Sequence, residues 1–231
     1  MSKTVVIFGA GGATGLELVR QAKARGHQVR AVEHERPFDA ADGDAVVHYE
    51  LDVMKDDLTE VMQGAYAVIS ALGLDAGLKT ILNPPPLYTE GTQKIVSAME
   101  ECGVTRLVVI SASFVETLKR GPIWFRAAAL VGLSSVVSEM KQMEWFLRGK
   151  QTIDWTAVRP GWLLDAPMTG DYVVAEDVIP RDLIRTRHGD LAHFMLDCVE
   201  EGSWLRQTPA IARAEPARVS GPDAVLREMM G

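Results

Sequence analysis

The chain has 231 residues, of which 47% are hydrophobic and 24% are charged, and its formal net charge at pH 7 is −7. These values are ordinary for a globular protein, and the length allows one large α/β domain with a substantial core. The negative charge argues against a general nucleic-acid-binding protein. No apolar run approaches the length of a membrane span, and the two cysteines, Cys102 and Cys198, are too few for a disulfide framework. We therefore expect a cytoplasmic protein that binds neither nucleic acid nor membrane.

The most informative stretch is 4–20, with the sequence TVVIFGAGGATGLELVR. Strand-forming residues run into a glycine-rich turn, and the turn runs into an amphipathic helix. The first backbone N–H groups of such a helix lack partners within it and carry the positive end of its dipole, so they favour an anion. This order of strand, turn and helix near the N-terminus predicts a dinucleotide site, with an ordinary glycine-rich βα turn as the alternative.

The glycines of this turn have the spacing G-x-x-G-x-x-G, at Gly9, Gly12 and Gly15. Gly9 permits a sharp exit from the strand, Gly12 lets a pyrophosphate approach the backbone, and Gly15 lets the helix pack close to the strand. The other dinucleotide spacing, G-x-G-x-x-G, begins at Gly9 and Gly11 but meets Thr14 at its last place. The spacing therefore favours the short-chain dehydrogenase type of loop.

Strand and helix patterns alternate along the chain, which predicts an α/β fold with a doubly wound parallel sheet. After 4–8 we expect strands at 28–33, 45–49, 65–72, 106–110 and 154–158, and helices at about 55–62, 87–101, 134–148 and 191–200. Gly26 and Gly103 are expected to end helices. Beyond residue 163 the pattern is less regular, with short strands expected at 172–174, 183–184 and 209–212 and a last helix after Gly221. No repeat or linker is evident, so we expect one domain over 1–231, whose part from about 163 onward contributes the substrate side.

The end of the second expected strand bears on the choice of dinucleotide. An acidic residue there binds the adenosine ribose hydroxyls, whereas a basic residue accommodates a 2′-phosphate. The chain has Glu33, His34, Glu35 and Arg36 at this place. Arg36 can reach a phosphate and His34 can stack or donate, Glu33 can bind ribose instead, and all four also suit a solvated loop. We expect NADP(H) in preference to NAD(H).

Ligands of open parallel sheets lie outside the carboxyl ends of the strands. Asp52 follows the third expected strand, where it can accept from the adenine amino group or cap the next helix. Residues 71–73 would flank the cofactor. Ser111 and Ser113 follow the fifth strand, where they either contact substrate or nicotinamide or satisfy loop backbone groups. Pro160 and Gly161 predict an extended loop that closely approaches the nicotinamide.

Five segments at Rossmann spacing resemble an atypical short-chain dehydrogenase: VVIFGAGGATG, LDV after the third strand, SALG after the fourth, VVISAS after the fifth and VRPGW after the sixth. With 166–172 (APMTGDY) and 189–198 (GDLAHFMLDC), the chain is also similar to the NAD(P)H-binding, NmrA-like group, which includes biliverdin reductase B, a flavin reductase. The resemblance covers about residues 3–200. It implies fold and cofactor and says little about the substrate.

The resemblance also implies a set of cofactor-binding residues along the strand ends. It assigns the pyrophosphate to the glycine loop, the adenine to the end of the third strand, the ribose side to the fourth, and the nicotinamide to the fifth and sixth. The residues are Gly9, Gly11, Gly12, Ala13, Thr14, Asp52, Val53, Ala71, Leu72, Gly73, Ser111, Ala112, Pro160, Gly161 and Trp162. Two positions depart from the family. His34 stands where an arginine commonly holds the 2′-phosphate, with Arg36 as a substitute, and Ala112 stands where the reductases have serine.

The usual proton-donating pair of short-chain dehydrogenases, Tyr-x-x-x-Lys, is absent from the chain. The residues four places after its four tyrosines are Val53, Ser70, Thr92 and Glu176. We therefore expect an NAD(P)H-dependent reductase whose acceptor is planar and conjugated (a flavin, quinone or tetrapyrrole-like compound), because such an acceptor can take its proton from water. If a side-chain acid is needed, Ser111, Ser113 and His188 are the candidates.

Two alternatives to a reductase are compatible with the sequence. An NmrA-like protein that senses NADP(H) without catalysis would also lack the tyrosine and lysine, and fold alone does not separate the two. An epimerase or dehydratase is weaker, because such enzymes rely on the absent tyrosine. We interpret Lys141 and Glu144 as a solvated helix face and 115–133 as either a lid or a packed segment. We expect a monomer or small homo-oligomer without a metal.

Overall fold

A computed structural model describes residues 2–34, 43–74, 85–117 and 134–220 of the chain. Its centre is an eight-stranded sheet in which only β8 runs antiparallel to its neighbour. In spatial order the strands are β3 (Val46–Glu50), β2 (Gln28–Glu33), β1 (Thr4–Phe8), β4 (Ala67–Ser70), β5 (Arg106–Ile110), β6 (Asp154–Pro160), β10 (Ala210–Ala212) and β8 (Val173–Ala175). The chain runs outward from β1 to β3 and then crosses to β4, so the strand order reverses beside β1. Such a reversal opens a crevice at the carboxyl ends of the strands.

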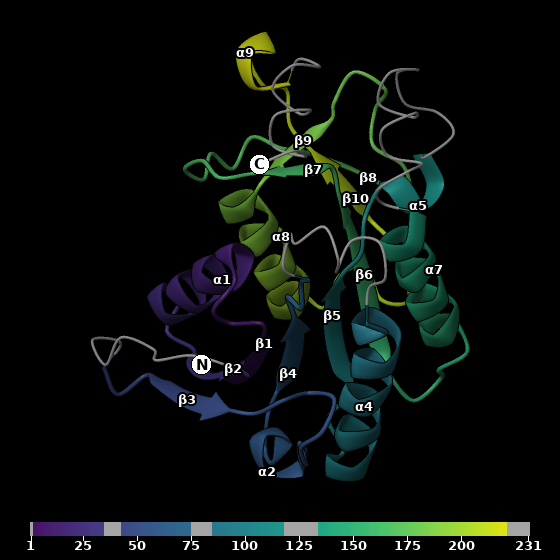
Figure 1. The fold of residues 1–231 in the computed structure, drawn as a ribbon. Helices are drawn as coiled ribbons and strands as arrows, with labels where there is room; N and C mark the ends of the chain where they lie inside the picture. Colours follow the sequence, from purple (N-terminus) through teal and green to yellow (C-terminus); the bar gives the residue numbers. More distant parts are fainter. Residues whose placement is uncertain (1, 35–42, 75–84, 118–133, 221–231) are drawn as a thin grey trace.

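Helices cover both faces of the sheet (Figure 1). One layer contains α1 (Ala13–Ala24) and α8 (His188–Glu201), and the other contains α2 (Thr59–Met62), α4 (Leu87–Cys102) and α7 (Ser134–Arg148). Alternate residues of β1 enter the two cores: Val5 and Ile7 pack in the core with α1 and α8, and Val6 and Phe8 in the other. Burial on both faces explains why β1, β4 and β5 are nearly continuous in apolar residues.

The remaining elements lie mostly beyond the carboxyl end of β6. They are the two-stranded parallel sheet of β7 (Trp162–Leu164) and β9 (Arg185–Arg187), and the short helices α5 (Phe114–Thr117) and α9 (Ala217–Ser220). Among the helices of the described residues, none combines the length and the apolar character that crossing a bilayer requires.

The predicted alternation of strands and helices is confirmed, and β1, β2, β5 and α7 have the predicted bounds. Gly103 ends α4 in the left-handed region at φ +69°, as predicted. The helix predicted at 55–62 is wrong over its first half, because the Asp52 carboxylate accepts the Met54 N–H at 2.8 Å and holds a turn there. The strand predicted at 183–184 lies two residues too early, since the residues paired with β7 are those of β9.

Two sequence-based predictions fall outside the described residues. The helix after Gly221 is one, and most of the 115–133 segment is the other.

Arg106, the first residue of β5, fixes the direction of α8. Arg106 is 7% exposed, and its guanidinium donates to the carbonyl oxygens of Cys198 (2.7 Å) and Ser203 (3.0 Å), at the end of α8. A cation is favourable at a helix C-terminus. Because α8 ends beside the start of β5, it begins toward the carboxyl ends of the strands, where α1 also begins.

Candidate functional site

The glycine loop between β1 and α1 has the backbone geometry that its spacing predicts. Gly9 is in the left-handed region at φ +71°, and a Cβ there would lie 2.5 Å from the Ala71 carbonyl oxygen. A Cβ on Gly15 would lie 2.0 Å from the Gly9 carbonyl oxygen, so α1 packs directly against the loop. A Cβ on Gly12 would meet only the Gly9 oxygen, at 3.5 Å. The loop therefore leaves its Gly12 side open to a ligand.

The start of α1 retains its positive end. Its N-cap, Gly12, supplies no side-chain hydrogen bond, and the first turn of the helix contains no acidic residue. Thr14 lies in this first turn, and its Oγ1 is 2.7 Å from Nδ1 of His188, the first residue of α8. Backbone amides and a hydroxyl at an uncapped helix start fit a pyrophosphate.

The carboxylate of Glu33, the last residue of β2, lies against the glycine loop. It accepts the Gly11 N–H at 3.0 Å, and its other oxygen lies 3.0 Å from both the backbone N and the Nδ1 of His34. Burial raises the pKa of Glu33, but the hydrogen bonds from His34 and Gly11 outweigh it, so the net shift is downward. Glu33 is therefore a fixed negative charge at this place. Arg36, the other predicted phosphate contact, lies outside the described residues.

The polar contacts of Asp52 are with residues close to it in the sequence. Its carboxylate accepts the Met54 N–H at 2.8 Å and pairs with Lys55 at 2.7 Å, so it holds a turn. The predicted alternative, that Asp52 caps the next helix, is wrong, because α2 begins only at Thr59. The neighbouring Val53 is buried, and its Cγ1 would lie 3.5 Å from a Cβ on Gly91 of α4. Leu72 meets the same position of α4. Ala71, Leu72 and Gly73 follow β4 at the strand ends, as predicted.

A buried polar cluster joins the ends of β5 and β6 to α7. Ser111 Oγ donates to Glu144 Oε1 at 2.7 Å, and Arg159 donates to both Glu144 oxygens, from Nε at 2.9 Å and from Nη2 at 2.6 Å. The three residues are 1–3% exposed. Burial alone lowers the pKa of Arg159, but the hydrogen bonds and charge of Glu144 raise it overall, so the guanidinium stays charged. The Ser111 proton is donated to a carboxylate, so in this arrangement the hydroxyl can only accept a further hydrogen bond.

Arg159 extends this cluster toward the segment that follows β8. Its Nη1 donates to the Asp177 carbonyl oxygen at 3.0 Å, and its Nη2 lies 3.5 Å from Glu116 of α5. Ser113 is fully buried, and its backbone N–H donates to the Pro160 oxygen at 2.9 Å. One guanidinium thus holds four segments together at the strand ends.

The extended backbone predicted at Pro160 and Gly161 is present, but the two residues join consecutive strands and do not form a loop. Pro160 ends β6 and Trp162 begins β7, so the chain continues from one sheet into the next. Gly161 is close to protein backbone: a Cβ would lie 2.7 Å from the Ile184 carbonyl oxygen, and its N–H donates to Thr186 Oγ1 at 2.8 Å. Its lack of a side chain is explained by strand packing. Beside it, the rings of Trp162 and Phe114 lie 6.0 Å apart.

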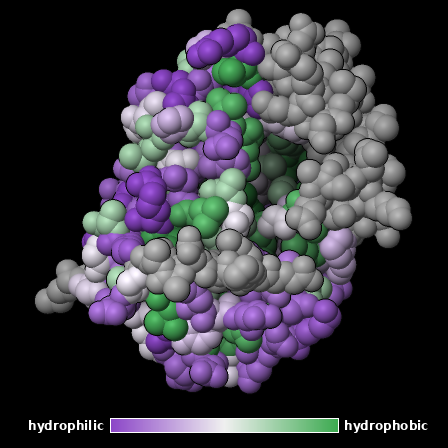
Figure 2. Space-filling model, turned by 60° about the vertical axis from the view of Figure 1, so that its left-hand side comes forward, coloured by the Kyte–Doolittle hydropathy of each residue, from purple (hydrophilic) through white to green (hydrophobic). Residues whose placement is uncertain are grey.

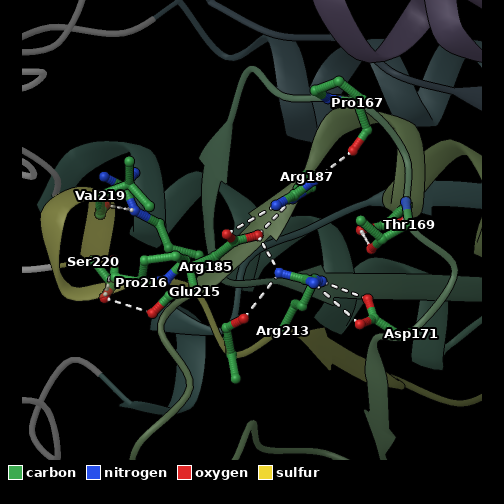
Figure 3. Close-up of polar contacts among 12 residues, drawn as sticks. Pro167, Thr169, Asp171, Arg185, Arg187, Arg213, Glu215, Pro216, Val219 and Ser220 are labelled. Carbon is green, nitrogen blue, oxygen red and sulfur yellow. Dashed lines mark hydrogen bonds and ion pairs between the residues drawn. The ribbon is translucent and has the colours of Figure 1, made fainter.

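A second polar network binds the segments beyond β6 (Figure 3). Glu215 accepts from Arg187 Nη2 at 2.9 Å and pairs with Arg213 Nη1 at 2.9 Å, and Arg213 Nη2 donates to Asp171 at 3.0 Å. Asp190, fully buried in the first turn of α8, accepts from the N–H and hydroxyl of Thr169. The segment before β8 is therefore held to α8 and to the chain after β10.

One face of the molecule is hollowed, and hydrophobic residues line the described part of the hollow (Figure 2). A hydrophobic recess is a common form of a small-molecule site.

The structure thus brings most of the predicted residues to one edge of the sheet, but it also adds Glu144. The prediction that Glu144 lies on a solvated helix face is wrong, because the residue is buried. A signal was present: Glu144 stands four residues after Met140 and seven after Val137, in the apolar stripe of α7. A carboxylate in such a stripe needs a buried partner, and Arg159 is that partner.

Comparison with known proteins identifies the family. The family model described as NAD(P)H-binding matches residues 9–202, from the glycine loop to the end of α8. An uncharacterized chloroplastic protein of Arabidopsis thaliana is 31% identical over 235 residues, which cover 96% of this chain and 81% of the relative.

Two solved structures share the fold. A candidate epimerase from Bacteroides thetaiotaomicron has a TM-score of 0.77 and 23% identity, covering 94% of this chain and 99% of its own. A candidate NADH-flavin reductase from Streptococcus pneumoniae has a TM-score of 0.72 and 20% identity, covering 92% of this chain and all of its own. These likenesses confirm the predicted Rossmann-type, doubly wound fold. Since the family model spans most of the chain, this protein belongs to the NAD(P)H-binding family.

Proposed function

We propose that this protein is an NAD(P)H-dependent oxidoreductase that delivers hydride to a planar conjugated acceptor, such as a flavin, a quinone or a tetrapyrrole-like compound. The observation that carries the proposal is the commitment of the Ser111 proton to Glu144 at the strand ends. The sequence also lacks the Tyr-x-x-x-Lys pair. A site whose strand-end serine, among the described residues, has its proton engaged suits an acceptor that is protonated by water.

The described residues fit the cofactor. The open Gly12 side and the uncapped start of α1 would hold the pyrophosphate, and the ends of β4, β5 and β6 would line the rest of the dinucleotide. When bound, the nicotinamide supplies the hydride. Ser111, with its proton engaged, would orient a ligand by accepting a hydrogen bond, and the hydrophobic hollow would hold a flat ring and exclude water (Figure 2).

Two further points support this acceptor class. The solved structure from Streptococcus pneumoniae is named as a candidate NADH-flavin reductase. The resemblance to the NmrA-like group and to biliverdin reductase B, noted on the sequence motifs, points the same way. In this proposal residues from about 163 onward contribute the substrate side, and Ser111 and Ser113 stay predicted site residues.

The cofactor preference proposed here differs from the expectation based on sequence. The expectation of NADP(H) rested on Arg36 and His34. Of these, His34 is 58% exposed at its side chain and is engaged by Glu33. The Glu33 carboxylate stands at the end of β2, where it would repel a 2′-phosphate and accept from ribose hydroxyls. We propose NAD(H) as the preferred cofactor.

The test measures oxidation of NADH and of NADPH with each of several free flavins and quinones and with biliverdin. Cofactor binding is measured in parallel by fluorescence. We expect oxidation of the cofactor that depends on one of these acceptors, and faster with NADH than with NADPH. Tight cofactor binding without turnover of any acceptor would overturn the reductase proposal. That outcome would support the alternative, an NmrA-like sensor of cofactor state.

A further inference from the structure

The first turns of α1 and α8 meet in one hydrogen bond at the glycine loop. Thr14 is the second residue of α1, and His188 is the first residue of α8, 174 positions later in the chain. Thr14 Oγ1 and His188 Nδ1 are 2.7 Å apart, and Thr14 is only 6% exposed. A histidine therefore stands directly behind a hydroxyl of the pyrophosphate loop.

This contact is held by the packing of the two helices. Gln21 of α1 donates to the Gly189 carbonyl oxygen at 2.9 Å, next to His188. Further along, Arg25 pairs with Asp197 at 2.7 Å and with Glu200 at 2.9 Å. The start of α8 is thus fixed against α1, and the imidazole has a defined place beside the loop.

The direction of this hydrogen bond depends on the protonation of His188. A threonine hydroxyl has one proton, and a neutral imidazole can accept that proton at Nδ1. A pyrophosphate has only acceptors. For Thr14 to donate to a phosphate oxygen, Nδ1 of His188 must itself be a donor to Thr14. The neutral Nδ1–H tautomer and the imidazolium both meet this condition, and the negative charge of a pyrophosphate favours the imidazolium.

When no ligand is bound, the surroundings of His188 favour the neutral imidazole over the imidazolium. Burial lowers the pKa of His188, and the nearby carboxylates Asp165 and Glu17 oppose this shift without cancelling it. The charges on the neighbouring elements are mostly engaged: Glu17 pairs with Arg20, and on α8 itself Asp190 is bonded to Thr169. The positive ends of two helices also disfavour a cation here. A bound pyrophosphate adds negative charge beside His188, which raises the pKa of the imidazole and favours the imidazolium.

We propose that His188 is a positioning residue for the dinucleotide and takes up a proton when the pyrophosphate binds. Protonated His188 donates from Nδ1 to Thr14, and the Thr14 hydroxyl is then free to donate to a phosphate oxygen. One proton from solvent is bound for each ligand bound. The inference rests on the proposed dinucleotide site, and it adds a link between cofactor affinity and pH.

The sign of that link follows from the two pKa values of His188. Ligand binding raises the His188 pKa, which burial lowers in the free protein. The affinity for the ligand therefore increases as pH falls from the His188 pKa of the complex to that of the free protein. Within this window the dissociation constant falls by up to about tenfold per pH unit, and outside it the constant is level.

The experiment is calorimetry of ADP-ribose binding between about pH 6 and about pH 8.5, each pH in two buffers of different ionisation enthalpy. ADP-ribose carries the pyrophosphate and no titrating 2′-phosphate. We expect proton uptake to rise toward about one per ligand inside the window. Nuclear magnetic resonance of the His188 imidazole in the wild-type protein should show its pKa raised by ADP-ribose.

Three variants separate His188 from its surroundings. His188→Asn keeps an amide donor near Nδ1 but does not titrate, so it should bind ADP-ribose without proton uptake and with an affinity independent of pH. Thr14→Val should bind more weakly, because the hydroxyl donor is lost. His193→Asn is the matched control, since His193 lies on α8 but bonds Tyr172 at 2.8 Å, and it should keep the wild-type uptake.

These measurements distinguish a failure of the proposed His188 role from a failure of the proposed function. Binding of ADP-ribose to the wild type without proton uptake would overturn the role of His188 alone. Uptake that persists unchanged in His188→Asn would do the same. Failure of ADP-ribose, NAD(H) and NADP(H) to bind the wild type at all would overturn the proposed function, and this inference with it.

Discussion

At the scale of single residues, Glu33 has the clearest functional consequence. It combines a position at the end of β2, a hydrogen bond from the Gly11 N–H and a lowered pKa. A carboxylate held in this way cannot move aside for a phosphate without giving up the Gly11 amide. Its charge is therefore part of the proposed dinucleotide site.

Replacing Glu33 by glutamine removes the charge and keeps the shape. We expect Glu33→Gln to lower the ratio of NADH to NADPH affinity by about tenfold, which is about 1.4 kcal/mol, since one repulsion between close like charges is of this order. The measurement is fluorescence titration with both cofactors. Glu60→Gln, the same change at an exposed position of α2, is the control. An unchanged ratio in Glu33→Gln would show that the carboxylate does not choose the cofactor.

At the scale of elements, the pair of Glu144 and Arg159 determines how α7 sits on the sheet. Apolar packing can hold a helix against strands at several rotations. A two-pronged contact from the Arg159 guanidinium to Glu144, with Ser111 as third member, fixes one of them. The same arginine reaches Asp177, so the position of α7 is coupled to the segment after β8.

Breaking this pair leaves a buried charge alone. We expect Glu144→Gln to reduce the free energy of unfolding by about 3–5 kcal/mol, because Arg159 keeps its charge at 1% exposure. Urea unfolding gives the measurement, and Glu101→Gln on the exposed side of α4 should change it by less than about 0.5 kcal/mol. The double variant Glu144→Met with Arg159→Met should recover much of the loss. A small effect of Glu144→Gln alone would contradict a tightly coupled pair.

At the scale of the whole molecule, ionic contacts hold the part beyond β6 to the sheet. Asp171 comes just before β8, and its partner Arg213 comes just after β10 (Figure 3). The hydrogen bonds from Arg213 lower the pKa of Asp171 to about 2. Arg187 and then Arg213 likewise lower the pKa of Glu215, whose side chain is 1% exposed.

These lowered pKa values predict lability to acid. Asp171 has a pKa of about 3.9 when unfolded and about 2 when folded, so its stabilising effect is complete above about pH 4 and is lost as pH falls toward 2. Asp171→Asn should lower the urea midpoint at neutral pH, and the difference from wild type should disappear in acid. Asp44→Asn, at an exposed carboxylate with no ion pair among the described residues, should show neither effect. A difference that is constant with pH would argue against an ionic role.

Much of the fold could be predicted because its signals are local. The alternation of strand and helix patterns, the glycine spacing and the helix-ending Gly103 each depend on neighbouring residues, and each prediction is confirmed. Predictions were weaker beyond residue 163. There the short strands β7 and β9 form only because Trp162 meets Arg185 from another part of the chain.

The sequence alone determined the glycine loop, the doubly wound type of sheet and the strand ends at which the predicted cofactor residues stand. Only the tertiary structure decided which polar side chains meet there. Thr14 and His188 lie 174 residues apart, and Ser111 and Glu144 lie 33 apart. Periodicity within an element tells which face is buried. It does not tell which residue of another element that face will contact, because that depends on how the helices and strands pack in three dimensions.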